Sequence, residues 1–198
     1  MNIGVLALVG VTPERMAALT AAGYAVREGK KYANRIDAVR EAGDTVRAVL
    51  TNGRGGLSGD EMAWLPNLEI VCTGSAGYEA VDLDTARRRG IVVANCPDAN
   101  APAVADSAMM LLMATTRHLL QADRFVRAGG WQDQWRVDTP TMTGERLGIL
   151  GLGKIGSRIA QRAARGCDAK ILYHNLRAEN GFSYRHFEPL IVLATWAD

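Results

Sequence analysis

Short apolar runs alternate with polar, glycine-punctuated segments through the first hundred residues of the chain. Each run has the length and the apolar content of a buried strand, and most are followed by a segment with helical spacing of its apolar positions. The predicted strands are residues 3–9, 24–27, 46–51, 68–73 and 91–95. Repeated βα units of this kind predict a parallel sheet with helices on both faces, which places the chain in the α/β class.

The predicted helices carry their own start and stop signals. Thr12 stands before Pro13, the residue favoured at the first helical position, and Gly23 follows the end of that helix. Ser58 and Glu61 have the spacing of a capping box, in which each side chain accepts a hydrogen bond from the other residue's backbone. Further helices are predicted at 34–42 and 84–89.

The βα pattern is interrupted at Cys96-Pro97-Asp98, which we take as a domain boundary. Residues 1–98 then form one domain, and residues 99–198 form the first part of another. A single long helix is predicted at 102–128, ended by Gly129-Gly130. Its first half is apolar on nearly all sides, which indicates burial between domains or between subunits.

A glycine-rich motif follows a predicted strand at 147–150 and opens a predicted helix. Its six residues are Gly151, Leu152, Gly153, Lys154, Ile155 and Gly156. The first glycine permits a sharp turn, the second lets the backbone approach a pyrophosphate, and the third lets the helix pack closely on the strand. The helix N-terminus also offers backbone donors to an anion. Strand, G-x-G-x-x-G and helix together predict a dinucleotide site, with an ordinary glycine-rich turn as the alternative.

Composition and charge exclude several classes of protein. The chain has 198 residues, 48% of them hydrophobic, and 23 Lys and Arg against 21 Asp and Glu, so that no polyanionic partner such as a nucleic acid is expected. The longest apolar candidate, 108–114, is too short to span a membrane. The N-terminal apolar run has no basic segment before it, as a signal peptide would. Three scattered cysteines, Cys72, Cys96 and Cys167, suit reduced thiols. We expect a soluble, cytoplasmic protein.

Two glycine loops stand where ligands of parallel sheets bind, beyond the carboxyl ends of strands. The first comprises residues 52–57 and follows Thr51, and the second comprises residues 74–78 and follows Thr73. Both are richer in glycine than a simple connection requires. Backbone N–H groups in such loops can form a binding site for an anion.

The sequence resembles the D-isomer-specific 2-hydroxyacid dehydrogenases, and in particular the hydroxypyruvate/glyoxylate reductase branch. The matching segments cover nearly the whole chain in the family's order and are residues 51–53, 74–83, 89–95, 104–106, 151–156 and 173–175. The resemblance implies a flavodoxin-like substrate domain followed by a Rossmann domain, with the substrate bound between them. It also implies an NAD(P)H-dependent oxidoreductase that interconverts a 2-oxo acid and a D-2-hydroxy acid.

The resemblance also implies roles for individual residues. In the family, backbone N–H groups of the second glycine loop hold the substrate carboxylate; these would be Ala76 and Gly77, with Ser75 beside them. Asn52 and Arg54 of the first loop would add polar contacts, although a solvated surface arginine is the alternative for Arg54. Val104 matches a position of the family on a helix beside the nicotinamide. A role in core packing alone is the alternative explanation for this residue.

The type of cofactor depends on the residues after the second strand of the dinucleotide unit, predicted at 170–173. An acidic residue there favours NAD, and an arginine favours the 2′-phosphate of NADP. The chain has Asn175 and Arg177 at this place and no carboxylate until Glu179. We therefore expect NADP(H) to be favoured, with NAD(H) possible. The branch often has an arginine where this chain has Leu176, which argues against this choice.

The family's catalytic residues are an Arg, a Glu and a His from the second half of the cofactor domain. We expect them beyond Asp198, since the sequence ends before the third strand of that domain is expected. His118 on the long helix, His174 at the adenosine end and His186 in a predicted loop are better explained as structural or solvated histidines. No metal-ligand spacing is present.

The isolated chain is expected to be inactive and to be unstable unless it dimerises. Its first Rossmann strand would have an unpaired apolar edge, and a homodimer through helix 102–128 would rescue it. The alternatives are a truncated, non-catalytic member of the family that binds a nucleotide or dimerises, and a protein that senses 2-oxo acids with the Ala76-Gly77 loop.

Overall fold

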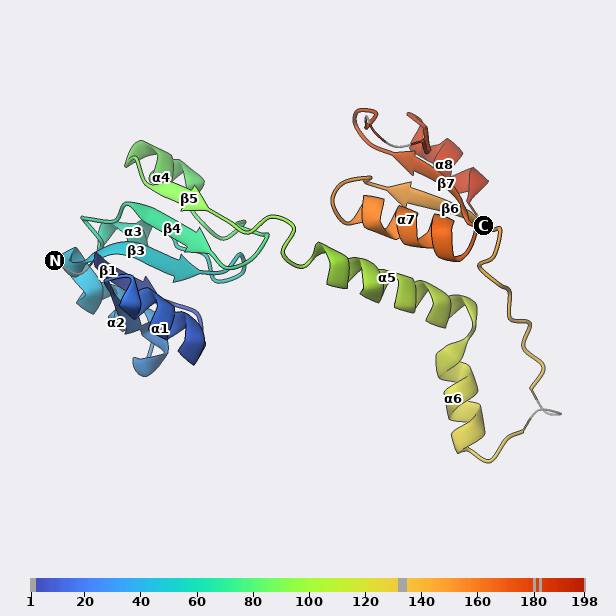
Figure 1. The fold of residues 1–198 in the computed structure, drawn as a ribbon, viewed down its shortest axis with the longest axis horizontal. Helices are drawn as coiled ribbons and strands as arrows, with labels where there is room; N and C mark the ends of the chain where they lie inside the picture. The colour runs from blue at the N-terminus through green and yellow to red at the C-terminus, as the bar shows by residue number, and fades with distance from the viewer. Residues whose placement is uncertain (1–2, 132–134, 180, 182, 198) are drawn as a thin grey trace. The chain divides into compact units, whose positions relative to one another are not determined.

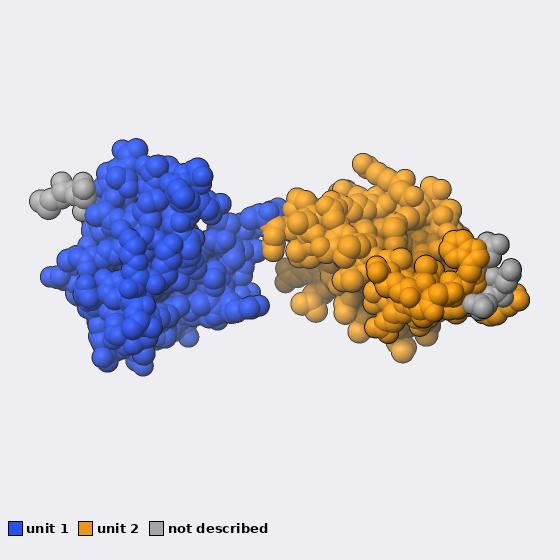
Figure 2. All heavy atoms as spheres, turned by 90° about the horizontal axis from the view of Figure 1, so that it is seen from below, with its two compact units in different colours: residues 1–99 blue, residues 100–198 orange. Residues whose placement is uncertain are grey.

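The computed structural model describes residues 3–131, 135–179, 181 and 183–197. The chain divides into two compact units, residues 1–99 and residues 100–198, which are coloured separately in Figure 2. Each unit has a parallel sheet of its own. The predicted boundary after residue 98 lies one residue before the boundary between the units.

Unit 1 is a five-stranded parallel sheet with the order β2-β1-β3-β4-β5 (Figure 1). The strands are β1 (Ile3–Ala7), β2 (Tyr24–Glu28), β3 (Val46–Thr51), β4 (Ile70–Thr73) and β5 (Val92–Ala94). This order is the flavodoxin-like one, in which the chain reverses direction across the sheet between β1 and β3. The predicted strands are therefore all present, although the first, fourth and fifth are shorter than the predicted runs 3–9, 68–73 and 91–95.

Each helix of unit 1 follows a residue whose side chain caps it, and Thr12 and Ser58 are the two caps that the sequence indicated. They are α1 (Pro13–Ala21), α2 (Arg35–Ala42), α3 (Gly59–Ala63) and α4 (Leu83–Arg88), and two short 3₁₀ turns, η1 (Gly29–Lys31) and η2 (Gly43–Thr45), join them to the strands. Ser58 and Glu61 form the reciprocal capping box at the start of α3. Asn34 caps α2 by accepting the Asp37 N–H at 2.9 Å. Each cap satisfies a donor that has no partner inside its helix.

The core of unit 1 lies between the sheet and its helices and is made of aliphatic side chains. Its largest fully buried members are Leu6, Leu57, Met62 and Leu65. At its edge, the Arg35 guanidinium of α2 donates to the Glu61 carboxylate of α3 at 2.5 Å and to the Gly56 carbonyl at 2.7 Å. This ion pair therefore joins two helices to the end of the first glycine loop.

Unit 2 has a three-stranded parallel sheet with the order β6-β7-β8. The strands are β6 (Arg146–Leu150), β7 (Lys170–His174) and β8 (Arg185–His186), and the helices α7 (Gly156–Gly166) and α8 (Leu190–Trp196) follow β6 and β8. The expectation that the chain ends before a third strand was wrong, because β8 pairs with β7 through Leu172 and Tyr173. The position of His186 in a loop was wrong for the same reason. Two residues are too few to give a periodic pattern, so the sequence carried no strand signal here.

The predicted single helix at 102–128 was also wrong, because the chain forms α5 (Ala101–Thr116) and α6 (Leu119–Arg127). His118 between them has a left-handed backbone with φ of 51°. The hydroxyls of Thr115 and Thr116 bond back to the carbonyls of Leu111 and Leu112. Bonds of this kind bend helices, and both lie in the last turn before the break.

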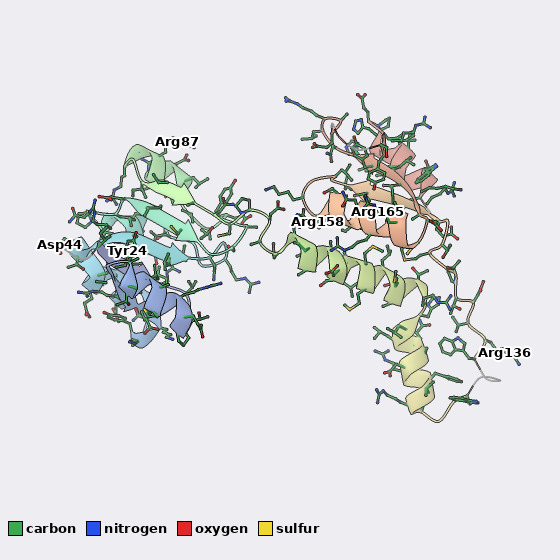
Figure 3. The ribbon with its side chains drawn as sticks, in the orientation of Figure 1. Tyr24, Asp44, Arg87, Arg136, Arg158 and Arg165 are labelled. Atoms are coloured by element: carbon green, nitrogen blue, oxygen red, sulfur yellow. The ribbon has the colours of Figure 1, made fainter. Side chains whose placement is uncertain are left out.

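Helix α5 packs on α7 within unit 2. Arg162 of α7 donates to the Asp106 carboxylate of α5 at 2.7 Å. Arg158 and Arg165, labelled in Figure 3, come from the same helix as Arg162. The core beneath α7 includes Ile149, Leu152, Ala160, Ala163 and Tyr173.

Candidate active site

The glycine motif of unit 2 has the geometry that each of its glycines suggests. Gly151 has φ of 95°, a conformation that other residues adopt at a cost. A Cβ on Gly156 would overlap the Gly151 carbonyl oxygen, so α7 can begin this close to β6 only with glycine there. A Cβ on Gly153 would meet no described atom within 4 Å. The backbone at Gly153 is therefore open to a ligand, as a pyrophosphate requires.

The start of α7 provides donors for such a ligand. Among the residues that the structure describes, the backbone N–H groups of Gly153, Ile155 and Gly156 have no protein acceptor. Lys154 and Ile155 are exposed, and Leu152 is buried beneath the loop. Unpaired donors at a helix N-terminus beside an open glycine suit a phosphate group, so these residues fit a dinucleotide.

Asn175 joins the glycine motif to the end of β7. Its side-chain oxygen accepts the Leu152 N–H at 2.7 Å, and its side-chain nitrogen donates to Glu179 at 3.2 Å. The sequence predicted a contact of Asn175 with the nucleotide, whereas in the structure its amide group is used within the protein. Arg177 is exposed, and Leu176 is fully exposed beside it.

The histidines have structural partners or positions. His174 Nδ1 lies 2.7 Å from the Phe187 carbonyl, and His186 Nε2 lies 3.0 Å from the Asn175 carbonyl. The two rings stack with centroids 6.2 Å apart. His118 lies at the break between α5 and α6. Through these contacts, His174 and His186 stabilise the region of β7 and β8.

Val104 lies in the first half of α5, and 37% of its surface is exposed. The buried residues of that helix are instead Ala101, Ala105 and Met109. Core packing therefore does not explain Val104, and its side chain is accessible to a ligand.

The two glycine loops of unit 1 are locked together. The Gly53 N–H donates to Ser75 Oγ at 2.7 Å, and that hydroxyl donates to the Gly77 carbonyl at 2.9 Å. A Cβ on Gly53 would lie 2.6 Å from the carbonyl carbon and oxygen of Gly77. The close approach of the two loops therefore depends on glycine at position 53.

The second loop leaves backbone donors open. Within the described part of the chain, the N–H groups of Ala76 and Gly77 have no acceptor. Their loop is held from the other side, because Asn95 donates to the Ala76 carbonyl at 2.7 Å and the Cys96 N–H donates to the Ser75 carbonyl at 3.0 Å. Two neighbouring open donors of this kind suit an anion such as a carboxylate.

Asn95 is a residue whose role sequence reasoning missed. It stands at the end of β5, where a polar residue after a strand gives a weak signal, and its partner is 19 positions away. In the first loop, Asn52 accepts the Gly55 N–H at 2.6 Å and so shapes its own turn. Arg54 is exposed.

Other kinds of site receive no support from the described residues. In that part of the chain, His, Cys, Asp and Glu side chains form no cluster of three or more that is able to hold a metal ion. No helix built from those residues is long and apolar enough to cross a membrane.

Comparison with known proteins identifies relatives over most of the chain. Residues 5–186 match the model of the family described as D-isomer specific 2-hydroxyacid dehydrogenase, catalytic domain. A glyoxylate/hydroxypyruvate reductase A of Arabidopsis thaliana is 36% identical over 155 residues, which are 78% of this chain and 49% of that protein. The chain therefore spans about half the length of this curated relative.

Solved structures give the same result. A 2-hydroxyacid dehydrogenase from Ketogulonicigenium vulgare aligns with a TM-score of 0.86 and 31% identity, over 100% of this chain and 63% of that one. An NADPH-dependent glyoxylate/hydroxypyruvate reductase from Sinorhizobium meliloti, in complex with NADP and malonate, aligns with a TM-score of 0.80 and 29% identity, over 100% and 61% of the two chains. The fold, the glycine motif and these matches together show that the chain belongs to the D-isomer-specific 2-hydroxyacid dehydrogenase family.

Proposed function

We propose that these 198 residues bind the substrate and part of the cofactor of an NAD(P)H-dependent oxidoreductase that interconverts a 2-oxo acid and a D-2-hydroxy acid. Hydroxypyruvate and glyoxylate are the first substrates to test, because relatives carry those names. The observation that carries the proposal is the pair of open backbone donors at Ala76 and Gly77, on loops that their own contacts hold rigid.

The substrate carboxylate would accept hydrogen bonds from the Ala76 and Gly77 N–H groups. Ser75 would shape the loop rather than bind, because its hydroxyl already bridges Gly53 and Gly77. Asn95 would keep the Ala76 peptide oriented so that the Gly77 N–H, which belongs to the same peptide as the Ala76 carbonyl, stays in place. Preorganised donors bind an anion better because little ordering remains to be done on binding.

The cofactor would place its pyrophosphate against Gly153 and the start of α7, and when bound it supplies the hydride. We expect NADP(H) over NAD(H), since Arg177 is exposed beyond β7 and can reach a 2′-phosphate. Glu179 lies within hydrogen-bond distance of Asn175 and opposes this preference by its charge. Val104 would provide an accessible apolar contact from α5.

Proton transfer and orientation of the substrate carbonyl require further residues. By the resemblance, these are an Arg, a Glu and a His that we place beyond Asp198. His174 and His186 are engaged with the carbonyls of Phe187 and Asn175, which is consistent with a role other than proton transfer. The proposal for the present chain is therefore one of binding, and turnover is assigned to a chain that contains the remaining residues.

Titration of the 198-residue chain with NADPH, NADH and glyoxylate tests this function. Nicotinamide fluorescence reports cofactor binding, and calorimetry reports glyoxylate binding. We expect NADPH to bind more tightly than NADH, and Gly77→Pro, which removes one backbone donor, to abolish glyoxylate binding while NADPH binding persists. Tighter binding of NADH would overturn the cofactor preference, and glyoxylate binding unaffected by Gly77→Pro would overturn the carboxylate site.

A homodimer through α5 and α6 is a second part of the proposal. Large apolar side chains on these helices and just after them are exposed, namely Met110, Leu111, Leu119, Leu120, Val126 and Trp131. Contiguous exposed apolar surface marks an interface more often than free surface. Analytical ultracentrifugation should show a dimer that Leu111→Glu and Leu120→Glu dissociate, and a monomer at high protein concentration would argue against it.

A reducing compartment, the cytoplasm, suits the three cysteines, all of which are free thiols.

The alternative of a family member that binds nucleotide without catalysis is favoured by the same glycine motif. The titration distinguishes this alternative from the favoured function, because a non-catalytic protein of this kind would bind NADPH and would not bind glyoxylate.

A further inference from the structure

A cavity of about 250 Å³ lies in unit 1 beside the second glycine loop. It lies where the ends of β3 and β4 meet the segment after β1, which is the place where the strand order reverses. Its lining includes Arg15, Cys72, Gly74 and Cys96. The two free thiols of unit 1 therefore line the same cavity.

The two cysteines differ in their surroundings. Cys96 is exposed, whereas Cys72 is half-buried in β4. Burial, and secondarily the nearby Cys96, raises the pKa of the Cys72 thiol. Arg15 also lines the cavity. Cys96 is thus the thiol that reacts first with a solvent-borne electrophile, and Cys72 is placed to react second.

The segment that carries Cys96 also holds the substrate loop. The Cys96 N–H donates to the Ser75 carbonyl at 3.0 Å, and the neighbouring Asn95 donates to the Ala76 carbonyl at 2.7 Å. These two bonds fix the peptide units that contain the open N–H groups of Ala76 and Gly77. Any displacement of residues 95–96 therefore changes the carboxylate site.

A bond between the two sulfurs would require such a displacement. Cys72 is opposite Ala94 in the β4–β5 pair, and Cys96 lies two residues farther along. If the chain continued past Ala94 in the extended direction of β5, strands about 4.8 Å apart and a rise of about 3.3 Å per residue would place the two Cα atoms about 8 Å apart. A disulfide needs a Cα separation below about 7 Å. The segment that carries Cys96 must therefore move inward by about 1 Å or more.

From this geometry we infer that Cys96 and Cys72 form a site of reversible oxidation by a hydroperoxide, which releases the substrate loop from its support at residues 95–96. The Cys96 thiolate attacks the peroxide, the O–O bond breaks, and Cys96 becomes a sulfenic acid while an alcohol or water leaves. The Cys72 thiol then attacks the Cys96 sulfur, the S–O bond breaks, and water leaves as the disulfide forms. The two thiols are oxidised and one peroxide is reduced.

The effect of oxidation on substrate binding rests on the proposed function, because it acts through the carboxylate site. The oxidation itself can be tested whether or not that function holds. The reduced 198-residue chain is treated with hydrogen peroxide, and its peptides are mapped under non-reducing conditions. We expect a Cys72–Cys96 disulfide that dithiothreitol reverses, while Cys167, buried in unit 2, stays reduced. In the Cys72→Ser variant, Cys96 should instead accumulate as a sulfenic acid that dimedone traps.

Amide hydrogen exchange tests the effect on the loop. Oxidation should speed exchange of the Cys96 N–H about tenfold, as loss of one ordinary hydrogen bond does. The Gly53 N–H, bonded to Ser75 Oγ, should follow, and the Gly74 N–H, bonded to the Thr51 carbonyl, should stay unchanged as the matched control. None of these changes should occur in Cys72→Ser.

Glyoxylate affinity separates the two proposals. If the reduced chain binds glyoxylate, oxidation should weaken that binding about tenfold, matching the exchange result. If the reduced chain does not bind it, the proposed function fails while the thiol results still decide the oxidation site. Absence of the Cys72–Cys96 disulfide when Cys167 is still reduced, or a disulfide that leaves Cys96 exchange unchanged, would overturn the inference.

Discussion

Replacement of Gly53 by alanine should separate the two glycine loops of unit 1. A Cβ there would lie 2.6 Å from the carbonyl carbon and oxygen of Gly77, and both are backbone atoms that have no alternative rotamer. Overpacking of this kind costs about 1–3 kcal/mol. Movement of the first loop would also strain the Gly53 N–H bond to Ser75 at 2.7 Å, which adds about 1 kcal/mol. We expect a loss of about 2–4 kcal/mol in the free energy of unfolding.

Urea unfolding followed by circular dichroism measures this loss, and glyoxylate calorimetry measures the effect on the carboxylate site. Gly74→Ala is the matched control, because its Cβ would meet the Thr51 carbonyl oxygen at 3.7 Å, an ordinary contact. We expect Gly74→Ala to remain within about 1 kcal/mol of the parent, as a glycine replaced without strain does. If Gly53→Ala were as stable as Gly74→Ala, the close approach of the loops would not be required, and the reasoning would be refuted.

Gly156→Ala should lower the free energy of unfolding by about 1–3 kcal/mol, because its Cβ overlaps the turn before it. Gly153→Ala should keep the stability of the parent and lose affinity for NADPH. Equal urea midpoints for the two variants would contradict this. Burial raises the pKa of Glu61, but hydrogen bonds from Arg35 and the Ser58 N–H outweigh it and hold that pKa below the ordinary value of 4.5. The stabilisation that ionised Glu61 gives the fold is therefore complete above pH 4.5 and is lost as the pH falls through its lowered pKa. The free energy of unfolding should therefore fall less steeply with acidification in Glu61→Gln than in the parent. Asn95→Ala should weaken glyoxylate binding about tenfold with little change in NADPH binding, and equal effects on both would indicate general unfolding.

Much of this fold was determined by local sequence. The apolar runs predicted all five strands of unit 1. Burial on both faces of a parallel sheet demands apolar segments of this kind in the central strands β1, β3 and β4, whereas the edge strands β2 and β5 have no buried residue. The capping box at Ser58 and Glu61 formed as its spacing indicates. The glycine motif also predicted its own geometry, since Gly151 and Gly156 meet steric demands that arise within six residues of chain.

Tertiary structure decided the contacts that shape the candidate site. Gly53 meets Gly77, Asn95 meets Ala76, and Asn175 meets Leu152 across 23 positions of sequence. Each pair is brought together by strand order, and a single sequence holds no information about which distant polar groups will face each other. The same reason explains the missed strand, because β8 exists only where β7 offers it an edge. The break after residue 116 lies instead beside local features that an apolar pattern does not reveal, namely the back-bonded hydroxyls of Thr115 and Thr116 and the left-handed His118.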